Sequence, residues 1–140
     1  MARYKRTDKE KRYDSQVIIY KDHTDEMGEY HMDIKKHGNV TVVHTPVRFD
    51  AHSSRDVEHV LQGVIKSGTK KVLCNFSHTD YISSAGLRVL LSASKELKKS
   101  DRQLYLCSAS SFVQEVLEIS GLTTILKIYE TEKDALSDIG

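Results

Sequence analysis

The chain has 140 residues, a length typical of a single domain and sufficient to bury a hydrophobic core without disulfide or metal support. Lys and Arg together number 21 and Asp and Glu together number 20, so the formal charge of +1 gives no general electrostatic reason to bind nucleic acid or anionic membranes. Hydrophobic residues make up 39% of the chain, which suits a small mixed α/β domain and excludes wholesale disorder.

Residues 1–28 are polar, and their charges fall into two blocks of opposite sign. Basic residues predominate in the first 12 positions, acidic residues predominate from position 22, and a short strand-like apolar run lies at 17–20. Such a segment buries too little apolar surface to offset the entropy lost on ordering. We therefore expect residues 1–28 to be a flexible or loosely docked extension and residues 29–140 to form the domain.

The hydrophobic pattern that follows predicts a hairpin. Apolar residues alternate with polar ones from Tyr30 to Ile34, as in a half-buried strand. A turn at 36–39 leads to a second strand, which begins at Val40 and runs toward Phe49. The two strands should pair in the antiparallel sense.

Helices and strands then alternate to the end of the chain. Apolar residues at positions 57, 60, 61, 64 and 65 form one helical stripe, with Ser53 and Asp56 spaced as an N-terminal capping pair and Gly68 as a stop signal. The later elements are a strand at 71–76, a helix through 87–97, a strand at 104–107, a helix that Ser111 and Gln114 cap and Gly121 ends, a strand at 125–129 and a helix at 131–139. This order predicts an α/β fold with a mixed, mostly parallel sheet of four to five strands and about four helices.

Most common catalytic and ligand-binding motifs are absent from the sequence. It contains no phosphate-binding glycine loop, no HExxH pair among its seven histidines and no GxSxG segment. Cys74 and Cys107 lie inside apolar runs and form no CxxC pair, so we expect two buried, reduced thiols in a cytoplasmic protein. We expect no metal, no cofactor, no secretory signal and no membrane span.

Residues 80–87, with the sequence DYISSAGL, place two hydroxyl groups at the start of a helix. One serine is enough to cap a helix by accepting a backbone N–H bond. A second serine would lie at the exposed N-terminal rim, where free N–H groups and the helix dipole favour an anion such as a phosphate. The spacing alone leaves both interpretations open and favours simple capping.

The segments 72–99 and 104–136, VLCNFSHTDYISSAGLRVLLSASKELKK and LYLCSASSFVQEVLEISGLTTILKIYETEKDAL, resemble STAS domains. Within that family they most resemble the bacterial anti-sigma factor antagonists, whose pattern is an apolar strand with Asn near its end and then Asp-Ser-Ser/Thr-Gly-Leu opening a helix. The resemblance covers about residues 30–140 and implies a STAS-like fold.

The resemblance also implies which residues form the site. Ser84 falls on the phosphoacceptor, with Ser83 as the second choice. The family carries Asp at the position of Ser83, Ser or Thr at Ala85, and Glu at Arg48, so these positions depart from the pattern. The implied partner-binding surface around Ser84 consists of Arg48, Asp50, Asn75, Asp80, Gly86 and Leu87.

The function that the resemblance implies is partner switching by an anti-sigma factor antagonist. The unphosphorylated protein would bind a kinase-type anti-sigma factor and free a sigma factor, the kinase would phosphorylate Ser84, and a serine phosphatase would reset the switch. The protein would then be a cytoplasmic, monomeric phosphoprotein in transcription regulation, and a kinase substrate rather than an enzyme. One alternative is a STAS adaptor of a transport or envelope complex, and another is a small hydrolase that uses Ser84.

Overall fold

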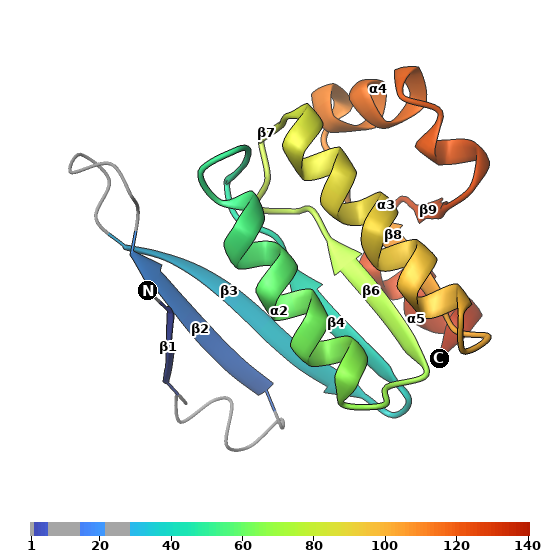
Figure 1. Ribbon diagram of the computed structural model, residues 1–140. Helices are drawn as coiled ribbons and strands as arrows, with labels where there is room; N and C mark the ends of the chain where they lie inside the picture. Colours follow the sequence, from blue (N-terminus) through green and yellow to red (C-terminus); the bar gives the residue numbers. More distant parts are fainter. Residues whose placement is uncertain (1, 6–14, 22–28) are drawn as a thin grey trace.

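The computed structural model describes residues 2–5, 15–21 and 29–140, and the side chains from Met32 onward (Figure 1). Its main sheet has the strand order β1-β2-β3-β4-β6-β8-β9. The strands are β1 (Ala2–Lys5), β2 (Ser15–Lys21), β3 (Glu29–His37), β4 (Val40–His44), β6 (Lys71–Asn75), β8 (Gln103–Cys107) and β9 (Lys127–Tyr129).

Five of these strands, β3, β4, β6, β8 and β9, make the predicted mixed sheet. β3 pairs with β4 as the predicted antiparallel hairpin, while β4, β6, β8 and β9 pair in parallel. The α/β class, the mostly parallel sheet and the number of main helices are therefore confirmed.

Two further strands come from the segment expected to be an extension. β2 contains the strand-like run at 17–20 and pairs with β3 along its whole length, and β1 pairs with β2. The expectation of flexibility also covers residues 6–14 and 22–28. These residues lie outside the part of the chain that the structure describes. We still predict that residues 1–28 can be removed without unfolding the domain. The Discussion describes a truncation that tests this prediction.

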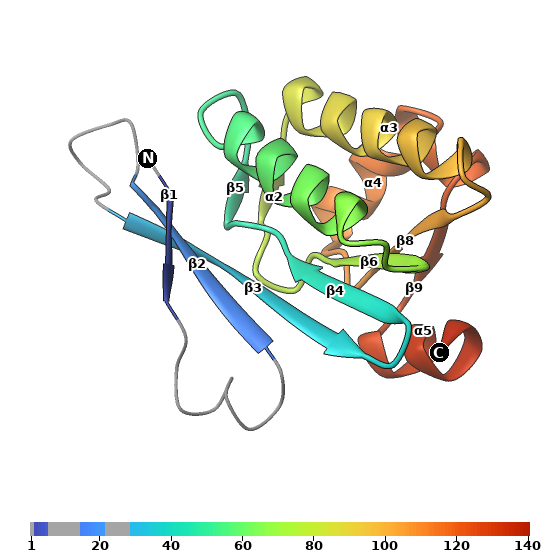
Figure 2. The same cartoon turned by 60° about the horizontal axis from the view of Figure 1, so that its bottom comes forward.

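Helices cover both faces of the sheet (Figure 2). α2 (Ser54–Lys66), α3 (Ser84–Lys98) and α4 (Ser111–Ile119) share one hydrophobic core with the sheet, whereas α5 (Glu132–Ile139) packs on the other face. The alternation of side chains along a strand explains the division. In β6, for example, Val72 and Cys74 belong to the first core and Leu73 belongs to the core beneath α5.

The second predicted strand is shorter than expected. It ends at His44, because Pro46 has no N–H group to continue the ladder. Residues Arg48–Phe49 form a separate strand, β5, which pairs in parallel with β7 (Tyr81–Ile82) in a two-stranded sheet.

Two of the predicted helix caps are also different. Ser53 is the N-cap residue of α2, but its hydroxyl makes no capping bond within the described residues and donates instead to the Arg48 carbonyl at 2.7 Å. In α4 the cap is Ser110 rather than Ser111, and its Oγ accepts the Val113 N–H at 3.2 Å. The partner of the Ser53 hydroxyl and the one-residue shift in α4 both follow from the local backbone, which the sequence pattern does not resolve.

The two cysteines are buried and unpaired, as predicted. Burial raises the pKa of the Cys74 thiol to about 12 and that of Cys107 to about 11, so neither forms a thiolate at neutral pH. Among the helices that the structure describes, none is long and apolar enough to cross a membrane.

Candidate functional site

The β5–β7 pair ties two loops together at the end of the main sheet where its parallel strands finish. The Asp80 N–H donates to the Val47 carbonyl at 2.9 Å, and the Ser83 N–H donates to the Phe49 carbonyl at 3.0 Å. These bonds fix the loop after β4 against the loop after β6. Loops at the carboxyl ends of parallel strands commonly carry the functional residues of α/β folds, and here the loop after β4 leads into α2 and the loop after β6 leads into α3 (Figure 1).

The two serines at the start of α3 differ in accessibility. Ser84 is the first residue of the helix and is exposed. Ser83 is the N-cap residue, and its buried Oγ has no hydrogen-bond partner among the residues that the structure describes. The simple capping interpretation therefore does not hold at this helix, and Ser84 is the hydroxyl that an enzyme can reach.

Gly86 allows the first turn of α3 to lie directly on β5. A Cβ atom at this position would be 2.7 Å from the Phe49 carbonyl oxygen and 2.9 Å from Cγ1 of Ile82. Any larger residue would therefore push the helix away from the loop pair. Gly86 is itself buried, so its contribution is to position Ser84 and not to offer surface, while Leu87 next to it is half-buried against the core.

Asn75 is also buried, and it holds the β6–β7 loop from within. Its Oδ1 accepts the Ser77 N–H at 2.8 Å, and its Nδ2 donates to Oε1 of Glu132 at 2.9 Å. Of the predicted contact residues, Asn75 and Gly86 thus lie beneath the surface. Arg48, Asp50, Asp80 and Leu87 are at least partly exposed.

A buried pair of threonines supports the same two loops, and the sequence pattern did not single it out. The Thr79 hydroxyl donates to the Pro46 carbonyl at 2.6 Å, the Thr45 hydroxyl donates to the Asn75 carbonyl at 3.4 Å, and the two hydroxyl oxygens are 2.6 Å apart. Both residues are buried. Hydrogen bonds of this kind make each hydroxyl compatible with burial and link the loops to each other.

Arg48 lies on the exposed side of the β5–β7 pair, opposite Tyr81. Its guanidinium carbon is 4.5 Å from the centre of the Tyr81 ring, and its Nε is 3.4 Å from Oδ2 of Asp50. The Tyr81 ring in turn stacks on Phe112 of α4, with 6.0 Å between ring centres and 15° between ring planes. The Arg48 side chain is nevertheless 57% exposed, so solvent screens its ion pair with Asp50.

Asp50 has a local structural role in addition to that ion pair. Its Oδ1 accepts the N–H groups of His52 at 3.0 Å and Ser53 at 3.3 Å, just before α2 begins. A carboxylate at this place accepts hydrogen bonds from backbone N–H groups before the first turn of the helix. Its negative charge also interacts favourably with the positive end of the helix dipole. Asp50 therefore shapes the loop before α2 and orients Arg48.

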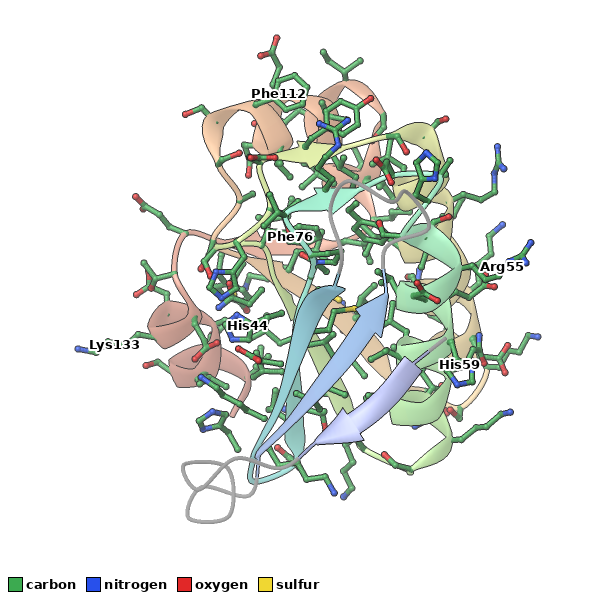
Figure 3. The ribbon with its side chains drawn as sticks, turned by 90° about the vertical axis from the view of Figure 1, so that its left-hand side faces the viewer. His44, Arg55, His59, Phe76, Phe112 and Lys133 are labelled. Carbon is green, nitrogen blue, oxygen red and sulfur yellow. The ribbon has the colours of Figure 1, made fainter. Side chains whose placement is uncertain are left out.

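His44 is a buried titratable residue that the sequence pattern did not single out. It ends β4 and faces α5, with Nε2 at 3.6 Å from Oε1 of Glu132 (Figure 3). Burial lowers the pKa of His44 below its ordinary value of 6.5, and Lys35 adds to this effect while Glu132 opposes it. At neutral pH the imidazole is accordingly uncharged.

Comparison with known proteins identifies the family. The STAS domain matches residues 31–135, and the chain belongs to this family. BtrV of Bordetella bronchiseptica, described as a candidate anti-sigma factor antagonist, is 35% identical over 83 residues, which are 59% of this chain and 72% of BtrV. The anti-sigma F factor antagonist of Paenibacillus polymyxa is 24% identical over 109 residues, 77% of this chain and 93% of the relative.

A solved structure has the same fold. The structure of the Bacillus cell-fate determinant SpoIIAA in its phosphorylated form superposes with a TM-score of 0.63 at 19% identity, over 78% of this chain and 99% of SpoIIAA. The sequence resemblance to STAS domains and the predicted fold are thereby confirmed.

Proposed function

We propose that this protein is an anti-sigma factor antagonist that works by partner switching. The unphosphorylated form binds a kinase-type anti-sigma factor and so frees a sigma factor. The kinase then phosphorylates Ser84, which ends the binding, and a serine phosphatase restores the starting state. The protein is a substrate of these two enzymes and performs no catalysis itself.

The observation that carries the proposal is the difference between the two serines at the start of α3. Ser84 is exposed and Ser83 Oγ is buried, so the kinase has one accessible hydroxyl at this motif. The descriptions of BtrV and of the Paenibacillus relative as antagonists support the role, and the phosphorylated form of SpoIIAA supports the modification.

The effect of the phosphate follows from its charge. A phosphoserine carries about −1.5 to −2 charges at neutral pH. On the free protein, the N–H groups of the first turn of α3 and the helix dipole accommodate this charge next to water. In a protein interface, the same charge has to be desolvated and repels carboxylates of the partner. A loss of about 2–4 kcal/mol in binding would weaken the affinity by roughly 30- to 1,000-fold.

Phosphorylation by the cognate kinase, followed by phosphopeptide mapping, tests the proposal. We expect the label on Ser84 and its loss in Ser84→Ala. Ser111 is the matched control, because it is also exposed and is also the first residue of a helix. Labelling mainly at Ser83 or Ser111 would refute the assignment. Ester hydrolysis that depends on Ser84 would favour a hydrolase, and a transport protein as the bound partner would favour an adaptor.

A further inference from the structure

Exposed apolar side chains gather beside the proposed phosphorylation site. Of the side chains that the structure describes, four large apolar ones are exposed: Val47, Phe112, Ile119 and Ile125. Val47 directly precedes β5, and Phe112 stacks on Tyr81 of β7. Two of the four therefore border the β5–β7 pair, and Phe112 projects from the end of the molecule where β7 lies (Figure 3).

Phe112 forms an ordered surface with Tyr81 and Arg48. Tyr81 contacts both the Arg48 guanidinium and the Phe112 ring, so the three side chains make one row, which we call the Arg48–Tyr81–Phe112 row. Phe112 keeps 47% of its surface exposed despite this contact, and Val47 keeps 53%. Aromatic and arginine side chains that are already ordered lose little entropy on binding, which is why they dominate the energetics of protein interfaces.

The charge of the row indicates the chemistry of its occupant. A guanidinium has five N–H donors, whereas Arg48 makes one ion pair within the described residues, through Nε at 3.4 Å. The other carboxylate oxygen of Asp50 is occupied by backbone N–H groups. The exposed donors of Arg48 match a second carboxylate, which an approaching protein can supply in a bidentate arrangement.

We propose that the Arg48–Tyr81–Phe112 row is a docking surface for the anti-sigma factor. The partner contributes an apolar side chain, which covers Phe112, and an adjacent carboxylate, which binds Arg48. This inference rests on the proposed function and specifies the chemistry of its interface.

The same geometry explains how phosphorylation acts on this surface. The Ser83–Phe49 hydrogen bond and the β5–β7 pairing hold Arg48 and the start of α3 at one end of the domain. A phosphate on Ser84 adds negative charge beside the place of the partner's carboxylate. It repels that carboxylate and competes with it for the guanidinium.

Immobilised wild-type protein first captures its serine kinase from an extract of the source cells, and mass spectrometry identifies that kinase. The kinase is then produced pure, and its binding to each variant is measured by calorimetric titration. Arg48→Glu and Phe112→Ala should each weaken binding at least about tenfold. The controls are Lys133→Glu, an equal change of charge on α5, and Ile125→Ala, a truncation at similar exposure of 43%. Both should stay within about twofold of wild type, and circular dichroism should show all four variants folded.

The outcomes separate this inference from the function on which it rests. If Arg48→Glu and Phe112→Ala bind like wild type while Ser84→Asp does not, the docking surface is wrong and the switch stands. If the two variants bind weakly while Ser84→Asp binds like wild type, the docking surface stands and the switch at Ser84 is wrong. If wild-type protein retains no kinase, both proposals fail.

Discussion

α3 and α4 both start with a Ser-Ser pair, but the hydroxyl of the N-cap serine has a different role in each helix. In α4, Ser110 caps the helix through its side chain, and Ser111 follows as the first helical residue. In α3, Ser83 occupies the same N-cap position with a similar extended backbone, but its hydroxyl is buried without a partner among the described residues. The comparison shows that a Ser-Ser pair at a helix start does not define a cap.

The two helices also differ three residues after each N-cap. α4 carries Val113 at that position, and its N–H donates the ordinary capping bond to Oγ of Ser110. α3 carries Gly86, which lets the helix approach the carbonyl of Phe49 on β5. Close contact with the β5–β7 pair thus replaces side-chain capping as the support of α3, and it leaves Ser84 exposed at the rim.

The largest expected effect comes from placing a carboxylate at each of the two helix starts. Ser84→Asp should weaken binding of the anti-sigma factor by about 30-fold or more, because it introduces a charge into the proposed interface. Ser111→Asp should leave the affinity unchanged within about twofold, because a surface charge at an ordinary helix start is well tolerated. Calorimetric titration measures both. Equal losses of affinity for the two variants would show that a charge at the start of α3 has no specific effect on binding.

Gly86→Ala should give the next largest effect. Its Cβ meets the Phe49 carbonyl at 2.7 Å, and such overpacking costs about 1–3 kcal/mol of unfolding free energy. Gly63→Ala is the control, because it lies in α2 with no atom within 4 Å of the added Cβ, and it should stabilise the protein by about 0.5–1 kcal/mol. Urea denaturation measures both, and a stable Gly86→Ala protein would contradict the close packing.

The two N-cap serines should respond differently to truncation. Ser110→Ala removes a capping bond and should cost about 1 kcal/mol of unfolding free energy. Ser83→Ala removes a buried hydroxyl without a partner among the described residues, so it should be neutral or slightly stabilising. The same denaturation experiment checks this, and equal losses would mean that Ser83 caps α3 in solution.

Removal of residues 1–28 should lower the melting temperature by only about a few degrees. β1 and β2 lie at the edge of the sheet, so their removal leaves the strand order from β3 to β9 unchanged. Scanning calorimetry of the truncated chain measures the change. Aggregation or a large decrease would show that β2 is an integral strand of the domain.

The smallest expected effect is on the pH dependence of stability. Because the pKa of His44 is lowered in the folded protein, the unfolded chain binds a proton more readily. Stability that is present above the ordinary value of 6.5 should therefore be lost as the pH falls toward the lower pKa of the folded state. His44→Gln should reduce this loss, whereas His59→Gln, on the exposed face of α2 (Figure 3), should not. Identical profiles for wild type and His44→Gln would refute the assignment.

The comparison of the two helix starts also shows what the sequence could predict. Apolar periodicity is a local signal, and it predicted the five strands of the main sheet from β3 to β9 and the four helices that follow the hairpin. The β5–β7 pair was missed because each strand has two residues, and their pairing joins positions that are far apart in the chain. The burial of Asn75, Ser83 Oγ and the Thr45–Thr79 pair was missed for a related reason, since it depends on which segments the fold brings together.

Direct comparison of unphosphorylated and phosphorylated protein tests the central claim most closely. The protein is phosphorylated completely at Ser84, and its affinity for the anti-sigma factor is measured by calorimetric titration before modification, after it, and again after treatment with a serine phosphatase. The account predicts binding that weakens by about 30- to 1,000-fold on phosphorylation and returns fully with the phosphatase. Equal affinities of the unmodified and Ser84-phosphorylated forms would contradict it.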